Sequence, residues 1–186
     1  GQITATKDEI GYSTGFGYDP MGRVNLVTPP SGDSTAWDST SITFAKVNSI
    51  EFGIGAGHWK QTTTTGRYRK EVVFDALWRP VLTHEWDSYL SNSHRYNVRA
   101  FDHEGRETFA AYPLGSMGTV DLVVGSNLGV KKKYDALGRL EKSIAFSERV
   151  PVLLETVVKY LPGYRKQIKN PRGQITEIDY LQYDAP

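Results

Sequence analysis

The chain has 186 residues, with 22 Lys and Arg against 21 Asp and Glu, so its formal net charge is only +1. A chain this balanced is neither a polybasic arm nor an acidic tail, and its charge indicates no nucleic-acid partner. The absence of cysteine excludes a disulfide framework, a cysteine-zinc site and a thiol nucleophile. No uncharged apolar stretch approaches the ~18 residues of a membrane helix, and the first ten residues do not resemble a signal peptide. Because the chain does not begin with Met, we expect it to be processed or cut from a longer protein.

A short motif recurs along the chain: an aromatic residue, then Asp, then Gly three positions later, followed by Arg. The four copies contain Tyr18, Asp19, Gly22 and Arg23; Phe74, Asp75 and Arg79; Phe101, Asp102, Gly105 and Arg106; and Tyr134, Asp135, Gly138 and Arg139. A fifth copy opens at Tyr183-Asp184, at the end of the chain. The first and last intervals between copies are about twice the middle ones, so we expect one degenerate unit in each.

The motif has the chemistry of a β-hairpin turn. Asp at the first position and Gly at the fourth favour a type I turn, in which the Asp side chain caps its own backbone. Gly in the left-handed conformation then gives a bulge that matches the twist of the two strands. Asp and Arg would face each other at the mouth of the hairpin, which contributes about 0.2–1 kcal/mol. We expect the aromatic residue to point to the opposite face and to pack against its counterpart in the next hairpin.

Further turns are expected at residues 8–11, 126–129, 161–164 and 170–173, each of which contains Gly with Asp, Asn or Pro. Runs of β-branched or alternating residues lie between the turns. These predicted strands are Arg23–Thr28, Lys70–Phe74, Tyr96–Phe101, Val130–Tyr134, Leu153–Tyr160 and Gln174–Tyr183. No stretch has a sustained helical period. The sequence therefore predicts an all-β fold of consecutive antiparallel hairpins.

These motifs and their spacing resemble the YD repeats of the rearrangement-hotspot (Rhs) family, which also occur in shell proteins of insecticidal toxin complexes and in teneurins. The segment Tyr134–Leu140 fits the family consensus at every specified position. Asn170–Thr176, followed by Tyr183-Asp184, resembles the paired half-repeat, with Asn in the Asp position. The resemblance spans about Gly15 to Pro186. It implies hairpins stacked into a curved, spiralling sheet that forms part of a hollow shell around a C-terminal toxin.

By this resemblance the chain is a non-catalytic piece of a bacterial shell, secreted or at the cell surface, with no cofactor. Its partners would be the rest of the shell and the enclosed toxin. We treat residues 1–186 as one repeat array in which residues 31–69 are a degenerate or inserted segment. Trp78 replaces the turn Gly in the second copy. Since a bulky residue at positive φ is unfavourable, we expect a different turn there, with Trp78 and Pro80 covering a seam.

The alternative is an extracellular module that binds glycans or other polyanions. Exposed aromatic rings could stack on sugars, and basic residues interleaved with tyrosines could bind a polyanion. The candidate basic residues are Lys131, Lys132, Lys133, Arg165 and Lys166. The same basic runs are also typical of solvated strand edges, where Lys discourages edge-to-edge pairing.

Other candidate chemistry is weaker. The pairs His84-Glu85 and His103-Glu104 lack the spacing of metal ligands, so we expect solvated or edge-pointing histidines and no metal site. Asp19-Pro20-Met21-Gly22 resembles the motif near the self-cleaving aspartate site of Rhs shells, but it has no second copy and turn chemistry explains it. The glycine-rich segment 53–57 lacks the lysine of a phosphate-binding loop and is expected to be a flexible connection.

Overall fold

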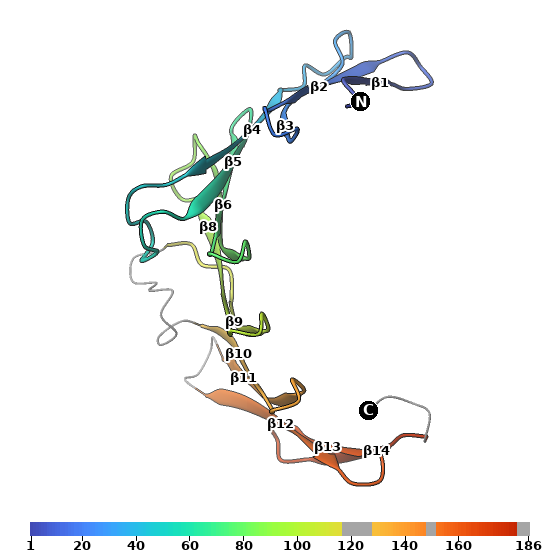
Figure 1. Cartoon of the computed structure of the whole chain (residues 1–186), viewed down its shortest axis with the longest axis vertical. Helices are drawn as coiled ribbons and strands as arrows, with labels where there is room; N and C mark the ends of the chain where they lie inside the picture. Colours follow the sequence, from blue (N-terminus) through green and yellow to red (C-terminus); the bar gives the residue numbers. More distant parts are fainter. Residues whose placement is uncertain (117–127, 148–151, 182–186) are drawn as a thin grey trace. The chain divides into compact units, whose positions relative to one another are not determined.

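The computed structural model describes residues 1–116, 128–147 and 152–181. These residues form fourteen strands and contain no helix (Figure 1). The strands are β1 (Ala5–Lys7), β2 (Ser13–Tyr18), β3 (Val24–Thr28), β4 (Thr40–Lys46), β5 (Trp59–Thr65), β6 (Tyr68–Phe74), β7 (Pro80–Asp87), β8 (Arg95–Phe101), β9 (Glu107–Ala111), β10 (Gly129–Tyr134), β11 (Leu140–Phe146), β12 (Leu153–Leu161), β13 (Arg165–Lys169) and β14 (Ile175–Asp179).

Strand order in the sheet follows chain order from β1 to β14. The described pairings are antiparallel, as in β2 with β3 and β10 with β11. This confirms the predicted all-β fold of consecutive hairpins. Each long interval between motif copies holds an additional hairpin, β4–β5 in the first and β12–β13 in the last, where a degenerate unit is expected. The last observed strand, β14, is shorter than the predicted strand Gln174–Tyr183, since it ends at Asp179.

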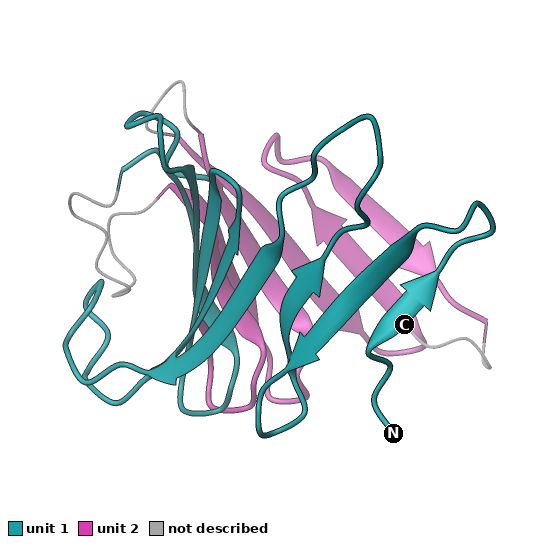
Figure 2. Ribbon diagram, turned by 90° about the horizontal axis from the view of Figure 1, so that it is seen from above, with its two compact units in different colours: residues 1–97, 113–119 teal, residues 98–112, 120–186 magenta. Residues whose placement is uncertain are grey.

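The chain divides into two compact units, coloured separately in Figure 2, and each is described by itself. The first unit comprises residues 1–97 with 113–119, and the second comprises residues 98–112 with 120–186. Strands β1 to β7 belong to the first unit and β9 to β14 to the second, while β8 begins in one and ends in the other.

The core of the first unit lies on one face of β6 and β7. Val73 and Leu82 are opposite each other in the register of these strands, and their exposed fractions are 0% and 1%. Because side chains alternate between faces along a strand, Glu71 and His84, which are also paired, lie on the same face. The segment between β4 and β5 packs over this face through Phe52, whose ring centroid lies 6.3 Å from that of His84.

The core of the second unit is similarly thin. Its buried apolar side chains among the described residues are Val98, Phe109 and Val158. Phe109 of β9 is opposite Lys131 of β10, while Val158 of β12 is opposite Ile168 of β13. A single sheet buries a side chain only where a neighbouring strand or segment covers it, so most strand residues remain partly exposed.

Two local expectations were wrong. Two histidines are buried rather than solvated, with exposed fractions of 8% for His58 and 6% for His84. His84 lies under the segment 47–58, of which His58 is the last residue. That segment has defined hydrogen bonds, including reciprocal bonds between the backbones of Glu51 and Ile54, and is not merely a flexible connection. Gly129 is the first residue of β10, and a Cβ there would overlap the backbone of Ala110.

Candidate functional site

The Asp19 turn shows how each motif closes its hairpin. The backbone N–H of Asp19 donates to the carbonyl of Arg23, and the N–H of Gly22 donates to the carbonyl of Asp19, both at 2.9 Å. Oδ1 of Asp19 accepts the backbone N–H groups of Met21 and Arg23 at 2.9 Å. Its Oδ2 accepts Nε–H of Arg23 at 2.7 Å. One carboxylate therefore satisfies two turn amides and holds the arginine on the next strand.

The same bonds recur at the other three copies. The distance from arginine Nε to aspartate Oδ2 is 2.7 Å at Asp75 and Asp102, and 2.8 Å at Asp135. The expected pairing of Asp with the following Arg is thus present in all four turns. The turn glycines have positive φ, as the bulge requires: 80° at Gly22, 86° at Gly105 and 79° at Gly138.

The expectation of a different turn at Trp78 was wrong. Trp78 has φ of 63°, and its N–H donates to the carbonyl of Asp75 at 3.1 Å, as the glycines do in the other copies. Left-handed backbone is unfavourable for L-residues by roughly 1–2 kcal/mol, so packing must offset this strain. The indole stacks on Phe44, with centroids 5.4 Å apart, and on Trp59, with centroids 5.6 Å apart.

Two further copies of the turn have no Asp–Arg pair. At Asn170 the side-chain oxygen accepts the N–H groups of Arg172 and Gln174 at 3.0 Å, and its Nδ2 donates to Gln174 Oε1 at 2.8 Å. Asp8 caps a turn of the same kind that is followed by Tyr12 in place of arginine. The sequence indicated turns at both places, but it did not show that their hydrogen bonds match those of the full motif.

Hydrogen bonding keeps the turn carboxylates ionised. The backbone N–H of Arg23 is the main cause that lowers the pKa of Asp19, and Arg139 does the same for Asp135. At Asp75, partial burial by itself would raise the pKa, but the hydrogen bonds from Arg79 outweigh it and the pKa is lowered. Each motif therefore remains an ion pair at neutral pH.

The turn arginines also connect successive hairpins. The guanidinium carbon of Arg106 lies 5.0 Å from the ring centroid of Tyr134 in the following hairpin, and Arg139 lies 4.0 Å from that of Tyr160. Arg23 covers Phe44 at 4.5 Å in the same way. We had expected the motif aromatic to meet its counterpart; these contacts are instead between a cation and the next aromatic ring, each worth roughly 0.5–1 kcal/mol.

Tyrosine hydroxyls add a second connection between neighbouring hairpins. The Tyr134 hydroxyl donates to the carbonyl of Glu107 on the preceding hairpin at 2.9 Å. Tyr18 donates in the same way to the carbonyl of Ile3 at 2.6 Å. Tyr134 is thus bound twice to the preceding hairpin, through Arg106 and Glu107. Phe74 and Phe101, which lack a hydroxyl, occupy the same position at the ends of β6 and β8.

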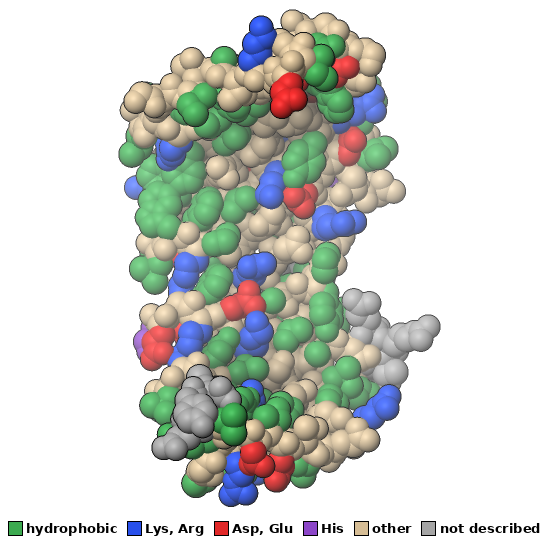
Figure 3. All heavy atoms as spheres, turned by 90° about the vertical axis from the view of Figure 1, so that its right-hand side faces the viewer, with side chains coloured by type: hydrophobic (Ala, Val, Ile, Leu, Met, Phe, Trp, Pro, Cys, Tyr) green, Lys and Arg blue, Asp and Glu red, His purple; other side chains and the backbone are tan. Residues whose placement is uncertain are grey.

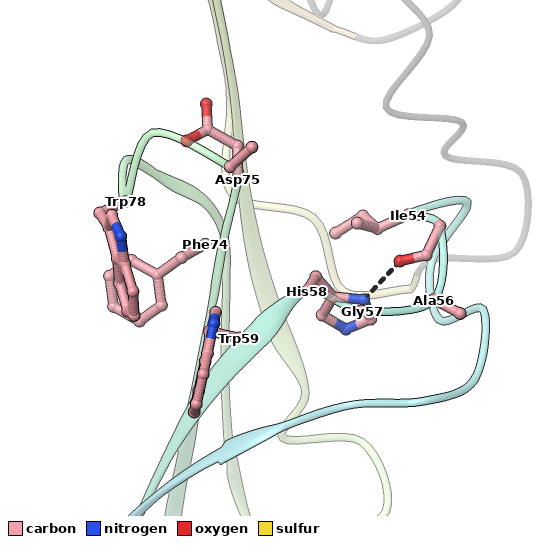
Figure 4. Close-up of a pocket in the computed structure, with 10 residues that line it drawn as sticks. Ile54, Ala56, Gly57, His58, Trp59, Phe74, Asp75 and Trp78 are labelled. Atoms are coloured by element: carbon pink, nitrogen blue, oxygen red, sulfur yellow. Dashed lines mark hydrogen bonds between the residues drawn. The ribbon is translucent and has the colours of Figure 1, made fainter.

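The pocket at the Asp75 turn is an open cavity of about 420 Å³ (Figure 4). Trp59, Phe74 and Trp78 lie together on one side of the strands, while His58 and the backbone of residues 54–57 lie on the other. Both oxygens of Asp75 are engaged by the turn and by Arg79. The cavity therefore offers aromatic surface but no free carboxylate for catalysis.

A family model described as RHS Repeat matches residues 1–35, which contain the Asp8 and Asp19 turns. The first 35 residues therefore carry an Rhs repeat. Among curated proteins, none is significantly similar to the chain. The turns at Asp75, Asp102, Asp135 and Asn170 have the same backbone hydrogen bonds as the Asp19 turn, so the same kind of turn recurs beyond the matched segment.

The basic residues proposed to bind a polyanion do not share one face of the sheet. In the register of β10 to β13, Lys131, Lys133 and Arg165 lie on one face, and Lys132 and Lys166 lie on the other. Lys132 donates to Glu107 at 2.8 Å, and Lys133 lies 2.9 Å from Glu141. Charges of both signs are interspersed on the surface that faces the viewer in Figure 3.

Within the described ranges, no cluster of three or more His, Cys, Asp or Glu side chains could hold a metal ion. The same part of the chain contains no helix long and apolar enough to cross a membrane. His103 is solvated, as expected, with a side chain 87% exposed. The fifth motif, Tyr183-Asp184, and the start of the turn predicted at residues 126–129 lie outside the described residues.

Proposed function

We propose that this Rhs-repeat chain is a non-catalytic wall segment of a shell that encloses or scaffolds a C-terminal toxin, outside the bacterial cell. The observation that carries the proposal is the link between hairpins, in which the arginine of one turn lies over the aromatic ring of the next hairpin. Such a link depends only on neighbouring units, so it can be repeated without limit along an array.

The turn chemistry supports a structural role. Catalytic carboxylates need a free oxygen and a pKa near the working pH, whereas both oxygens of Asp19, Asp75 and Asp135 accept hydrogen bonds and their pKa values are lowered. The conserved use of Asp and Arg in four turns of one chain is explained by hairpin closure and stacking. No chemical step is required to account for these residues.

Lysine cross-linking in the intact parent protein tests the wall. The exposed lysines Lys133, Lys159 and Lys169 lie on one face of the sheet, and Lys132 and Lys166 lie on the other. A wall has an inside and an outside, so a C-terminal domain should be cross-linked to lysines of one face only. Cross-links from both faces, or a polypeptide that ends without any domain after the repeats, would contradict the proposal.

The second candidate function is binding of a glycan or another polyanion. The register supports it at one place, because Lys133, Lys159, Arg165 and Lys169 are exposed on the same face of β10, β12 and β13. Retention on heparin, compared with a Lys159→Glu and Lys169→Glu double variant, tests this. Salt-sensitive retention that the double variant loses would support a binding module, and elution at low salt by both proteins would exclude it.

A further inference from the structure

His84 is one of two buried histidines of the first unit, and its surroundings are polar on one side and aromatic on the other. Its ring is stacked between Trp86 and Tyr96, with both centroids 4.1 Å away. Its Nε2 lies 2.8 Å from Nδ1 of His94. Its Nδ1 is buried without a hydrogen-bond partner and lies 3.7 Å from Oε2 of Glu71.

The segment 47–58 covers this histidine. Phe52, in left-handed backbone with φ of 53°, has its ring 6.3 Å from both His84 and Tyr96. Glu51 anchors the same segment to the sheet through Lys60 of β5, at 2.9 Å between Nζ and Oε2. The contacts of Phe52 and Glu51 thus determine whether water reaches His84.

The hydrogen bond between the two histidines limits the charge that the covered state accepts. Between Nε2 of His84 and Nδ1 of His94 there is room for one proton, so one ring must present a lone pair. If both rings were fully protonated, two N–H groups would point at each other across 2.8 Å. The ammonium of Lys60 is already near, bound to Glu71 at 3.3 Å, and adds to the repulsion.

We propose that the segment 47–58 is a pH-sensitive cover, which leaves the face of β6 and β7 when His84 takes up a proton. In the covered state the imidazolium would be removed from water and would lie beside His94 and near Lys60. In the uncovered state water solvates it. This inference concerns the first unit alone and holds whether or not the proposed wall function is correct.

The charges near His84 do not reverse the direction in which its pKa is shifted. Burial lowers the pKa of His84, and Glu71, which raises it, does not overcome that effect. The titratable and charged groups around His84 come from every element packed on it. The strands contribute Lys60 from β5, Glu71 from β6, and His94 and Tyr96 from β8 and the segment before it. The cover contributes Glu51 and His58, and Arg69, which is opposite Trp86, donates to backbone carbonyls.

The pKa of His84 determines how the stability of the covered state changes with pH. Because the covered state has the lower His84 pKa, it is fully favoured above the ordinary value of 6.5 and is weakened as the pH falls below it. A single proton can shift the opening equilibrium by at most about tenfold per pH unit in this window. The turn aspartates do not contribute, since they are protonated only below the ordinary aspartate pKa of 3.8.

Hydrogen exchange of the full 186-residue chain tests the cover. We expect amides of residues 50–58, after correction for the intrinsic pH dependence, to exchange several-fold faster at pH 5 than at pH 7.5. The chain has only four histidines, so NMR titration of their ring protons should give a His84 midpoint below 6.5 that coincides with the exchange transition. His84→Gln should abolish the transition, and His103→Gln, which changes a solvated side chain, should retain it.

If His84→Gln does not fold, Phe52→Ala gives a second test, because it loosens the cover without changing a titratable group. Its exchange should be fast already at pH 7.5 and should change less between the two pH values. Exchange that is constant from pH 7.5 to 5 in the unmodified chain overturns the proposal. So does a transition of equal size in His84→Gln.

Discussion

Replacement of Trp78 by Gly separates two opposing effects at one position. Gly occupies this position in the Asp19, Asp102 and Asp135 turns with φ of 79–86°, and it removes roughly 1–2 kcal/mol of left-handed strain. The indole is 54% exposed, so about half of it, roughly 100 Å², is removed from water and contributes about 2.5 kcal/mol. Its stacking on Phe44 and Trp59 adds roughly 1 kcal/mol.

Packing should therefore exceed strain, and Trp78→Gly should lower the free energy of unfolding by roughly 2 kcal/mol. Trp78→Ala loses the same contacts but keeps a Cβ at positive φ, so it should be less stable than the Gly variant by about 1 kcal/mol. Urea unfolding followed by circular dichroism measures both differences. A Gly variant as stable as the original chain would refute the packing argument, and equal stability of the two variants would refute the strain argument.

Three further predictions concern the turns and the strand surface. Asp75→Ala should destabilise the chain by about 1–2 kcal/mol in urea, since two turn amides lose their acceptor, and an unchanged midpoint would contradict this capping role. Replacing Asn170 with Asp together with Gln174 by Arg should change stability by less than about 1 kcal/mol, because a charged pair replaces a neutral pair of the same geometry; a larger loss would show that the turns are not equivalent. Burial and the hydrogen bond to Glu85 raise the pKa of Tyr68 to about 12, so Glu85→Gln should lower that pKa in an ultraviolet titration, and an unchanged value would exclude the contribution of Glu85.

Protonation of the turn aspartates should lower the stability of the chain at a more acidic pH than the one at which the cover opens. Their pKa values are lowered in the folded state, so their contribution to stability is complete above the ordinary aspartate pKa of 3.8. It is lost as the pH falls through the lowered pKa values of the folded state. Unfolding midpoints measured from pH 5 to pH 2 should decrease mainly below pH 4. A chain that is equally stable at pH 2 and pH 5 would contradict this assignment.

Local chemistry explains why so much of the repeat could be predicted from the sequence. A turn is built from residues within five positions of each other, so Asp, Gly and Arg at fixed spacing determine its hydrogen bonds and its register. The pairing of Asp102 with Arg106 and of Asp135 with Arg139 followed from this alone. The degenerate hairpins were also predicted, because spacing shows where a unit must fit.

Contacts between segments distant in the chain decided the rest. Trp78 keeps the ordinary turn only because Phe44 and Trp59 lie where its ring can stack, and nothing near Trp78 in the sequence indicates this. His84 is buried because residues 47–58 fold back over one face, and Lys131 to Lys133 are divided between two faces by strand alternation. The sequence by itself determined the hairpin and its closing ion pair, since these are local. Only the tertiary structure decided what covers each face, because burial depends on which distant segment packs there.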